Sequence, residues 1–157
     1  LEQYKGIGSA KAITILAACE LGKRRQKATV EEAPILNSAE NIYQFMHTTI
    51  QDLDIEEGWV LMMKQNFRLI EAKRISVGGL TMAPVDLRLM MKEVLLKNTT
   101  VLAFCHNHPS GSTNPSRDDD ILTSHIHKAC ELLHIHFADH VILTDGGYFS
   151  YREEGKL

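Results

Sequence analysis

Residues 100–119 read TVLAFCHNHPSGSTNPSRDD, and three local patterns follow one another in this stretch. Residues 100–105 are a short apolar run, which is typical of a buried central strand. A polar loop with two prolines and a glycine follows at 106–115. Ser116 and Asp119 then match the capping box that begins a helix. The stretch therefore predicts a strand, a loop and a helix in succession.

The segments on either side continue this alternation. Helical spacing of apolar residues predicts helices over 9–27, from Ser38 to about Leu53, around 87–95, and from Ser116 to about Leu133. Strand-like patterning predicts a β-hairpin and two later strands, at 59–63 with 68–77, at 135–143 and at 148–151. Strands that alternate with helices predict an α/β fold.

The composition is that of an ordinary globular protein, with 44% apolar and 24% charged residues in a chain of 157. This composition excludes wholesale disorder, and no apolar run approaches the roughly 18 residues that a membrane span needs. The three cysteines have no CxxC spacing, which predicts reduced thiols in a cytoplasmic protein. Because the chain starts at Leu1 and not at a methionine, we expect it to be part of a longer protein.

The net charge of −3 conceals an asymmetry along the chain. Residues 1–27 contain six basic and two acidic residues, whereas residues 28–157 contain 11 basic and 18 acidic ones. A basic segment ahead of an acidic body indicates two partners or two functions. We predict a helical segment at 1–27, a linker at 28–37 and a domain at 38–157.

Two histidines at the end of the predicted central strand have the spacing of a metal chelate. His106 and His108 are two residues apart, so their imidazoles leave the strand on one face. Asp119 lies in the first turn of the next helix and can turn its carboxylate toward them. Two imidazoles and one carboxylate are the protein ligands of a catalytic zinc site with a fourth position open to water.

Spacing alone does not single out one histidine pair, because the eight histidines form three H-x-H pairs. On a helix His125 and His127 point to different faces, and His134 with His136 fits a solvated strand edge. Cys105 faces the opposite side of its strand and is predicted to lie in the core. The H-x-E and P-C-x-x-C motifs of zinc deaminases are absent from the sequence. The letters H-N-H also lack the dispersed histidines of an HNH nuclease.

The pattern resembles the metalloprotease signature of the JAMM/MPN family, in which H-x-H-P is followed after six residues by S-x-x-D. The matching residues are His106, His108, Pro109, Ser116 and Asp119. The string HNHPSGSTNPSRDD and the ending DHVILTDGGYFSYREEG are similar to the RadC branch, bacterial proteins named for DNA repair, and the likeness covers about 38–157. It implies a cytidine-deaminase-like fold, a mixed sheet flanked by helices, and zinc held by His106, His108 and Asp119.

The same resemblance implies an upstream glutamate that activates water. Glu56 and Glu57 stand where the first hairpin strand begins, and only one of them can face the metal because they point to opposite faces. Alignment with the family pattern favours Glu56, with Glu57 as the alternative. Where the family commonly has an aromatic residue two positions later, this chain has Gly58. The resemblance also implies that Ser116, besides capping its helix, hydrogen-bonds to the water or the substrate oxyanion.

Residues 4–13, YKGIGSAKAI, resemble the second half of a helix-hairpin-helix motif. In that motif backbone N–H groups at a helix start bind a DNA phosphate without reading bases. The resemblance assigns DNA contacts to Gly6, Gly8 and Lys11. Because the first helix of the pair would precede Leu1, we expect weak, non-specific DNA binding through residues 1–27, or none. The alternative is that this helix packs on its own body or on a neighbouring copy.

We therefore expect a zinc-dependent JAMM-type hydrolase that cleaves a peptide or isopeptide bond of an unidentified protein or peptide. The alternative is a non-catalytic, DNA-associated accessory protein whose zinc site is structural or vestigial. A metal-dependent nuclease is disfavoured, because many phosphodiester hydrolases use two metals. No membrane partner is expected, and the sequence is compatible with an oligomer.

Overall fold

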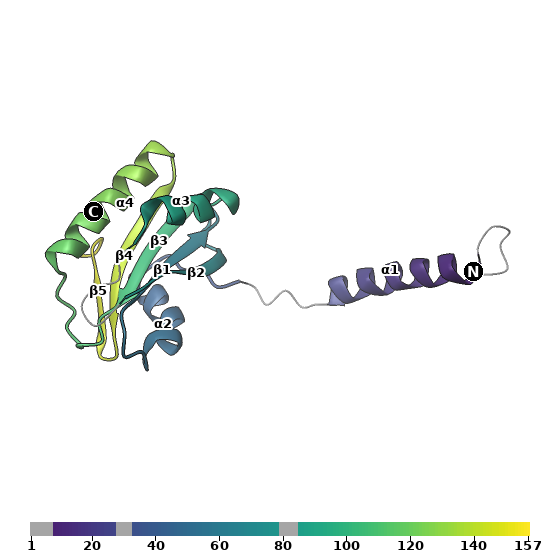
Figure 1. The fold of residues 1–157 in the computed structure, drawn as a ribbon, viewed down its shortest axis with the longest axis horizontal. Helices are drawn as coiled ribbons and strands as arrows, with labels where there is room; N and C mark the ends of the chain where they lie inside the picture. Colours follow the sequence, from purple (N-terminus) through teal and green to yellow (C-terminus); the bar gives the residue numbers. More distant parts are fainter. Residues whose placement is uncertain (1–7, 28–32, 79–84) are drawn as a thin grey trace. The chain divides into compact units, whose positions relative to one another are not determined.

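The computed structural model describes residues 8–27, 33–78 and 85–157 (Figure 1). The chain divides into two units, residues 1–32 and residues 33–157. In the first unit α1 (Ser9–Lys27) is one helix, which confirms the helix predicted over these residues. Among the described residues, no helix is long and apolar enough to cross a membrane.

The second unit is built on a five-stranded sheet with the order β2-β1-β3-β4-β5. Its strands are β1 (Glu57–Met63), β2 (Leu69–Val77), β3 (Val101–Asn107), β4 (His136–Thr144) and β5 (Gly147–Ser150). The pair β3 and β4 is parallel, and the other neighbouring pairs are antiparallel. The sheet is therefore mixed, and the predicted hairpin and central strand are confirmed.

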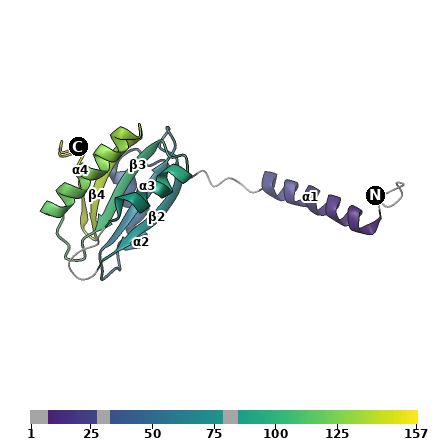
Figure 2. The same cartoon turned by 45° about the horizontal axis from the view of Figure 1, so that its top comes forward.

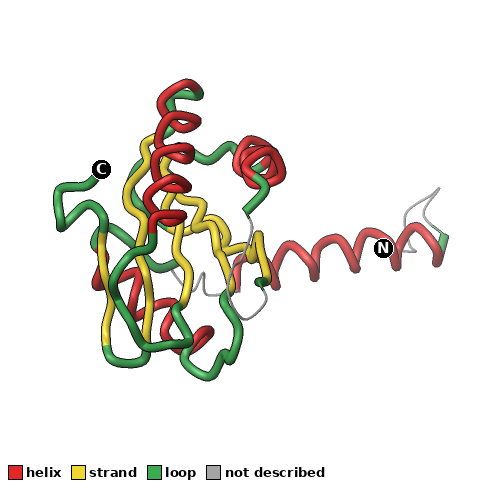
Figure 3. The backbone as a smooth tube through the Cα atoms, turned by 60° about the vertical axis from the view of Figure 1, so that its left-hand side comes forward, coloured by secondary structure: helices red, strands yellow, loops and turns green. Residues whose placement is uncertain are grey.

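Helices cover both faces of this sheet, as predicted. One face carries α2 (Ala39–Ile50), and the other carries α3 (Leu87–Leu96) and α4 (Arg117–Leu132), which Figure 2 shows together. Figure 3 shows α4 running along the strands. Ser38 caps α2 as predicted, because its side chain accepts a hydrogen bond from the backbone of Asn41.

Two hydrophobic cores lie on the two faces, and the inner strands divide their side chains between them. Leu61 and Cys105 pack in the core under α2, whereas Val60 and Phe104 pack in the core under α3 and α4. Because a strand turns successive side chains to opposite faces, His106 lies on the α4 side, next to Phe104 and opposite Cys105. The strand pattern therefore places a histidine under the start of α4.

Residues 33–37, which the sequence predicts to be part of a linker, belong to the second unit and pair with the residues just before β2. The N–H of Leu36 donates to the carbonyl of Phe67, and the carbonyl of Pro34 accepts from the N–H of Leu69. The side chain of Leu36 is 2% exposed because it enters the core under α2. Residues 28–32 of the same predicted linker lie outside the described residues.

Candidate metal centre

The two histidines that follow the apolar run occupy the end of β3. His106 pairs with both neighbouring strands and is 2% exposed. The prediction that the loop starts at His106 is therefore wrong by two residues, because pairing with β1 continues to His106 and pairing with β4 continues to Asn107. His108 follows the strand, and its N–H donates to the carbonyl of Leu143 over 2.9 Å. Both imidazoles lie on the side that α4 covers.

Asp119 lies in the first turn of α4 and is held by the cap of that helix. Its N–H donates to Ser116 Oγ over 3.2 Å. Its Oδ2 atom accepts from the backbone N–H and from the hydroxyl of Ser116, each over 2.7 Å. This is the predicted capping box. It leaves Asp119 Oδ1 facing His106 Nε2 at 3.1 Å.

The two glutamates at the start of β1 have different surroundings. Glu56 Oε1 lies 3.8 Å from His106 Nε2. The Glu57 carboxylate instead accepts hydrogen bonds from Arg74 Nη1 over 2.6 Å and from Trp59 Nε1 over 3.2 Å. Of the two glutamates, Glu56 therefore lies beside His106, whereas the Glu57 carboxylate is hydrogen-bonded to Arg74 of β2.

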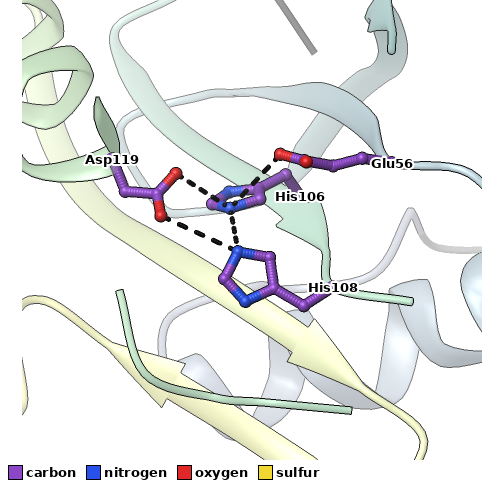
Figure 4. A group of neighbouring side chains, drawn as sticks. All are labelled: Glu56, His106, His108 and Asp119. Atoms are coloured by element: carbon purple, nitrogen blue, oxygen red, sulfur yellow. Dashed lines mark hydrogen bonds and ion pairs between the residues drawn. The ribbon is translucent and has the colours of Figure 1, made fainter. Parts of the chain in front are cut away.

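Four side chains from three parts of the chain converge on one point, as Figure 4 shows. One ligand atom from each of them lies within 4.8 Å of the others; the four are Glu56, His106, His108 and Asp119. Together they could hold a metal ion. The predicted ligands His106, His108 and Asp119 are therefore brought together, and Glu56 joins them.

The chemistry of these four groups fits a divalent cation. His108 Nδ1 lies 2.7 Å from the Ser112 carbonyl oxygen, which can only accept, so in the neutral ring Nδ1 carries the proton and Nε2 is bare. That bare Nε2 atom lies 3.0 Å from His106 Nε2. Two nitrogens on one tetrahedral zinc ion would be about 3.4 Å apart. Two imidazole nitrogens and two carboxylates therefore surround a space suited to a cation.

The surroundings shift two pKa values in opposite directions. Burial acts to raise the pKa of Asp119, but the adjacent imidazoles of His106 and His108 and the hydroxyl of Ser116 outweigh it and hold this pKa well below its ordinary value. The Asp119 carboxylate raises the pKa of His108, although burial opposes the rise. The carboxylate is therefore ionised, and a proton competes with any metal for the His108 nitrogen.

His140, on β4, is a buried neighbour of the centre that the sequence patterns do not indicate. Its Nε2 atom lies 2.9 Å from His106 Nδ1, and its Nδ1 atom lies 2.6 Å from Thr123 Oγ1. Burial lowers the pKa of His140 well below its ordinary value. His140 has no histidine two residues away, so spacing did not reveal it. The available signal was a histidine inside an apolar strand.

The group of four converging side chains includes none of the other described residues that were considered from the sequence. Cys105 is 0% exposed in the core under α2, as predicted, and burial raises the pKa of its thiol. Gly8 and Lys11 belong to the first unit, and Gly6 lies outside the described residues. Four further histidines are exposed, as predicted for the last two of them: His125, His127, His134 and His136.

A cavity of about 420 Å³ adjoins the centre on one side. His108 and Pro109 form part of its wall, and the segment after α2 forms another part. Asp52, Asp54 and Asp145 also line it. There is therefore room beside His108 for part of a ligand.

Comparison with known proteins gives a consistent result over the second unit. The family model described as the RadC-like JAB domain matches residues 36–156. A UPF0758 protein of Flavobacterium johnsoniae is 39% identical over 155 residues, which cover 99% of this chain and 68% of the relative. One from Porphyromonas gingivalis is 35% identical over 155 residues, with 98% and 68% covered. One from Rubrobacter xylanophilus is 37% identical over 157 residues, with 100% and 69% covered.

Proposed function

The chain belongs to the family of RadC-like JAB domains, and on this premise we propose that it is a zinc-dependent hydrolase of peptide or isopeptide bonds. The convergence of Glu56, His106, His108 and Asp119 is the observation that carries the proposal. Two imidazoles and a carboxylate are a ligand set of catalytic zinc, which keeps one position for water. The residues assigned as ligands are His106, His108 and Asp119.

Glu56 is assigned as the general base. Its carboxylate stands 3.8 Å from His106 Nε2, farther than the Asp119 carboxylate at 3.1 Å, which leaves room for a water molecule on its side. When bound, zinc would supply one piece of chemistry, a water acidic enough to attack a carbonyl near neutral pH. Glu56 would accept a proton from the attacking water and return it to the leaving amine.

Ser116 has a structural role that limits its catalytic one. Its single hydroxyl hydrogen is donated to Asp119 Oδ2 over 2.7 Å. A hydrogen bond from this hydroxyl to the substrate oxyanion therefore requires the hydroxyl to turn away from Asp119. We assign Ser116 first to the positioning of Asp119 and second to the oxyanion.

Metal analysis and a matched pair of variants test this proposal. We expect the purified protein to contain one zinc ion per chain and His108→Ala to contain none. On a panel of fluorogenic peptide amides and isopeptide conjugates, Glu56→Gln should keep zinc and lose hydrolysis by at least about 100-fold. Glu57→Gln, which changes the neighbouring carboxylate, should retain activity. Hydrolysis that survives in Glu56→Gln would remove Glu56 as the base, and a zinc-free protein would remove the whole proposal.

The second candidate is a DNA-associated accessory function carried by the first unit. The first turn of α1 follows Gly8, contains Lys11 and has no acidic residue, which suits a phosphate. Titration of labelled duplex DNA against the chain with and without residues 1–27 separates the two candidates. Binding that requires residues 1–27 and weakens with salt supports the DNA function. Equal binding by both chains contradicts it.

A further inference from the structure

His106 can present Nε2 to a metal only if its own proton sits on Nδ1. A neutral imidazole carries one proton and can place it on either nitrogen, and its hydrogen-bond partner decides between them. The partner of His106 Nδ1 is the buried His140, whose Nε2 atom is 2.9 Å away. On the opposite side of the ring, Asp119 Oδ1 lies 3.1 Å from His106 Nε2 and attracts the proton to Nε2 while no metal is bound. Two imidazoles facing each other leave the choice open, so a preference for Nδ1 must come from the other side of His140.

The second ring nitrogen of His140, Nδ1, faces the hydroxyl of Thr123. The hydrogen of that hydroxyl is already donated to a main-chain carbonyl oxygen, which can only accept. Thr123 Oγ1 lies 2.6 Å from the main-chain carbonyl oxygen of Asp119, and its one hydrogen is donated there. The same Oγ1 atom lies 2.6 Å from His140 Nδ1 and must therefore accept from that nitrogen. With the proton on Nδ1, the Nε2 atom of His140 is an acceptor, and His106 Nδ1 has to be the donor.

Packing holds this chain of hydrogen bonds in one arrangement. The ring of Tyr151 stacks on His140 with centroids 4.8 Å apart and planes 6° apart, and Phe104 meets it edge-on at 5.0 Å. His140 is 0% exposed and Thr123 is 3% exposed. Water therefore has no access to replace either partner.

We propose that Thr123 and His140 are positioning residues that draw the proton of His106 to Nδ1, against the attraction of Asp119, and so leave its Nε2 lone pair directed at the metal. This inference rests on the zinc site proposed above. The chain of hydrogen bonds starts at the main chain of Asp119 and ends at His106, so it links two of the assigned ligands. These buried hydrogen bonds thereby fix the position of the His106 ring relative to Asp119.

The tautomer of His140 can be read directly in the zinc-loaded protein, where the metal takes the place of the proton that Asp119 attracts to His106 Nε2. Nitrogen-15 NMR of the imidazole rings should show the proton of His140 on Nδ1. A His140 proton on Nε2 in the wild-type protein would overturn the inference, and this measurement needs no variant.

A matched set of threonine variants then tests what the tautomer does for metal binding. Thr123→Val keeps the shape and removes the hydroxyl; we expect a second His140 tautomer and zinc affinity lowered about 10-fold or more in chelator competition. Thr123→Ser should restore both. Thr99→Val is the control, because the Thr99 hydroxyl is also buried but has no hydrogen-bond partner among the described residues. It should leave affinity unchanged.

The outcomes separate this inference from the function on which it rests. Equal zinc affinity in Thr123→Val and Thr99→Val would overturn the positioning role even if the protein is a zinc hydrolase. If the protein binds zinc with His140 in the inferred tautomer but hydrolyses no peptide or isopeptide bond, the hydrolase proposal fails and the positioning role stands. If Thr123→Val does not fold, the wild-type tautomer still decides.

Discussion

Gly58 lies in β1 between Ser76 of β2 and His106 of β3, directly after the two glutamates. A Cβ atom at this position would stand 2.5 Å from Ser76 Oγ and 3.0 Å from Phe104 Cζ. Phe104 thus occupies the space that a side chain at position 58 would need. This explains why a glycine is tolerated where the family commonly has an aromatic residue.

Gly58→Ala should destabilise the protein by about 1–3 kcal/mol, because the buried ring of Phe104 cannot yield without disturbing its core. Gly146→Ala is the control, since a Cβ atom there meets nothing within 4 Å. Chemical denaturation of both variants gives the free energy of unfolding. A loss in Gly58→Ala no larger than in Gly146→Ala would contradict the close approach of Phe104.

The raised pKa of His108 leads us to expect opposite effects of pH on zinc affinity and on the stability of the metal-free protein. Its pKa is raised, chiefly by the Asp119 carboxylate. A metal must displace that proton, so zinc affinity should fall as the pH decreases through the raised pKa. In the metal-free protein a raised folded pKa stabilises below the unfolded value, and this stabilisation is lost as the pH rises through the folded pKa.

Chelator competition and denaturation between about pH 6 and pH 8 check both signs, because this interval brackets the ordinary range of imidazole titration. The variant His108→Ala should lose the pH-dependent part of the metal-free stability. The control His125→Ala, which removes an exposed helical imidazole, should keep it. Metal-free stability that rises through this interval only when His108 is present would contradict the shift.

At the scale of elements, the start of α4 joins helix formation to the metal centre. Ser116 accepts from the N–H of Asp119 and donates to its carboxylate, so the same side chain caps the helix and orients a ligand. In α2 the equivalent cap is Ser38, which accepts from Asn41 and lies away from the four converging side chains. A comparison of the two serines therefore separates the stability lost with a helix cap from the metal affinity lost when Asp119 is no longer held in place.

Ser116→Ala and Ser38→Ala should each lower the free energy of unfolding by about 1 kcal/mol, the usual cost of losing a helix cap. Only Ser116→Ala should also weaken zinc binding, because only it frees the Asp119 carboxylate. Denaturation and chelator competition on both variants measure the two effects. Equal zinc affinity in the two variants would show that Asp119 needs no support from Ser116.

At the scale of the whole molecule, the two hydrophobic cores consist of residues from the second unit. Removal of residues 1–32 should therefore leave the free energy of unfolding and the zinc content of residues 33–157 unchanged. Denaturation and metal analysis of the shortened chain check this. Aggregation or loss of cooperative unfolding in residues 33–157 would show that the first unit contributes to the fold.

Most elements of the second unit were predictable because apolar periodicity reports local burial. Helix α2 and the β1–β2 hairpin follow from the spacing of apolar residues that are only a few positions apart in the sequence. The order of strands was not predictable, since it depends on which surfaces pack after α4 returns the chain beside β3. The strand character of His106 and the packing of Leu36 were missed for the same reason, because both depend on segments distant in sequence.

The sequence by itself determined the local part of the metal centre. Two histidines spaced along a strand and a capping box at a helix start place His106, His108 and Asp119 through backbone geometry over a few residues. Tertiary structure alone decided the surroundings of Glu56 and Glu57 and brought His140 behind His106. The reason is physical: these contacts depend on strand pairing and on the packing of α4 over the sheet, which no short stretch of sequence encodes.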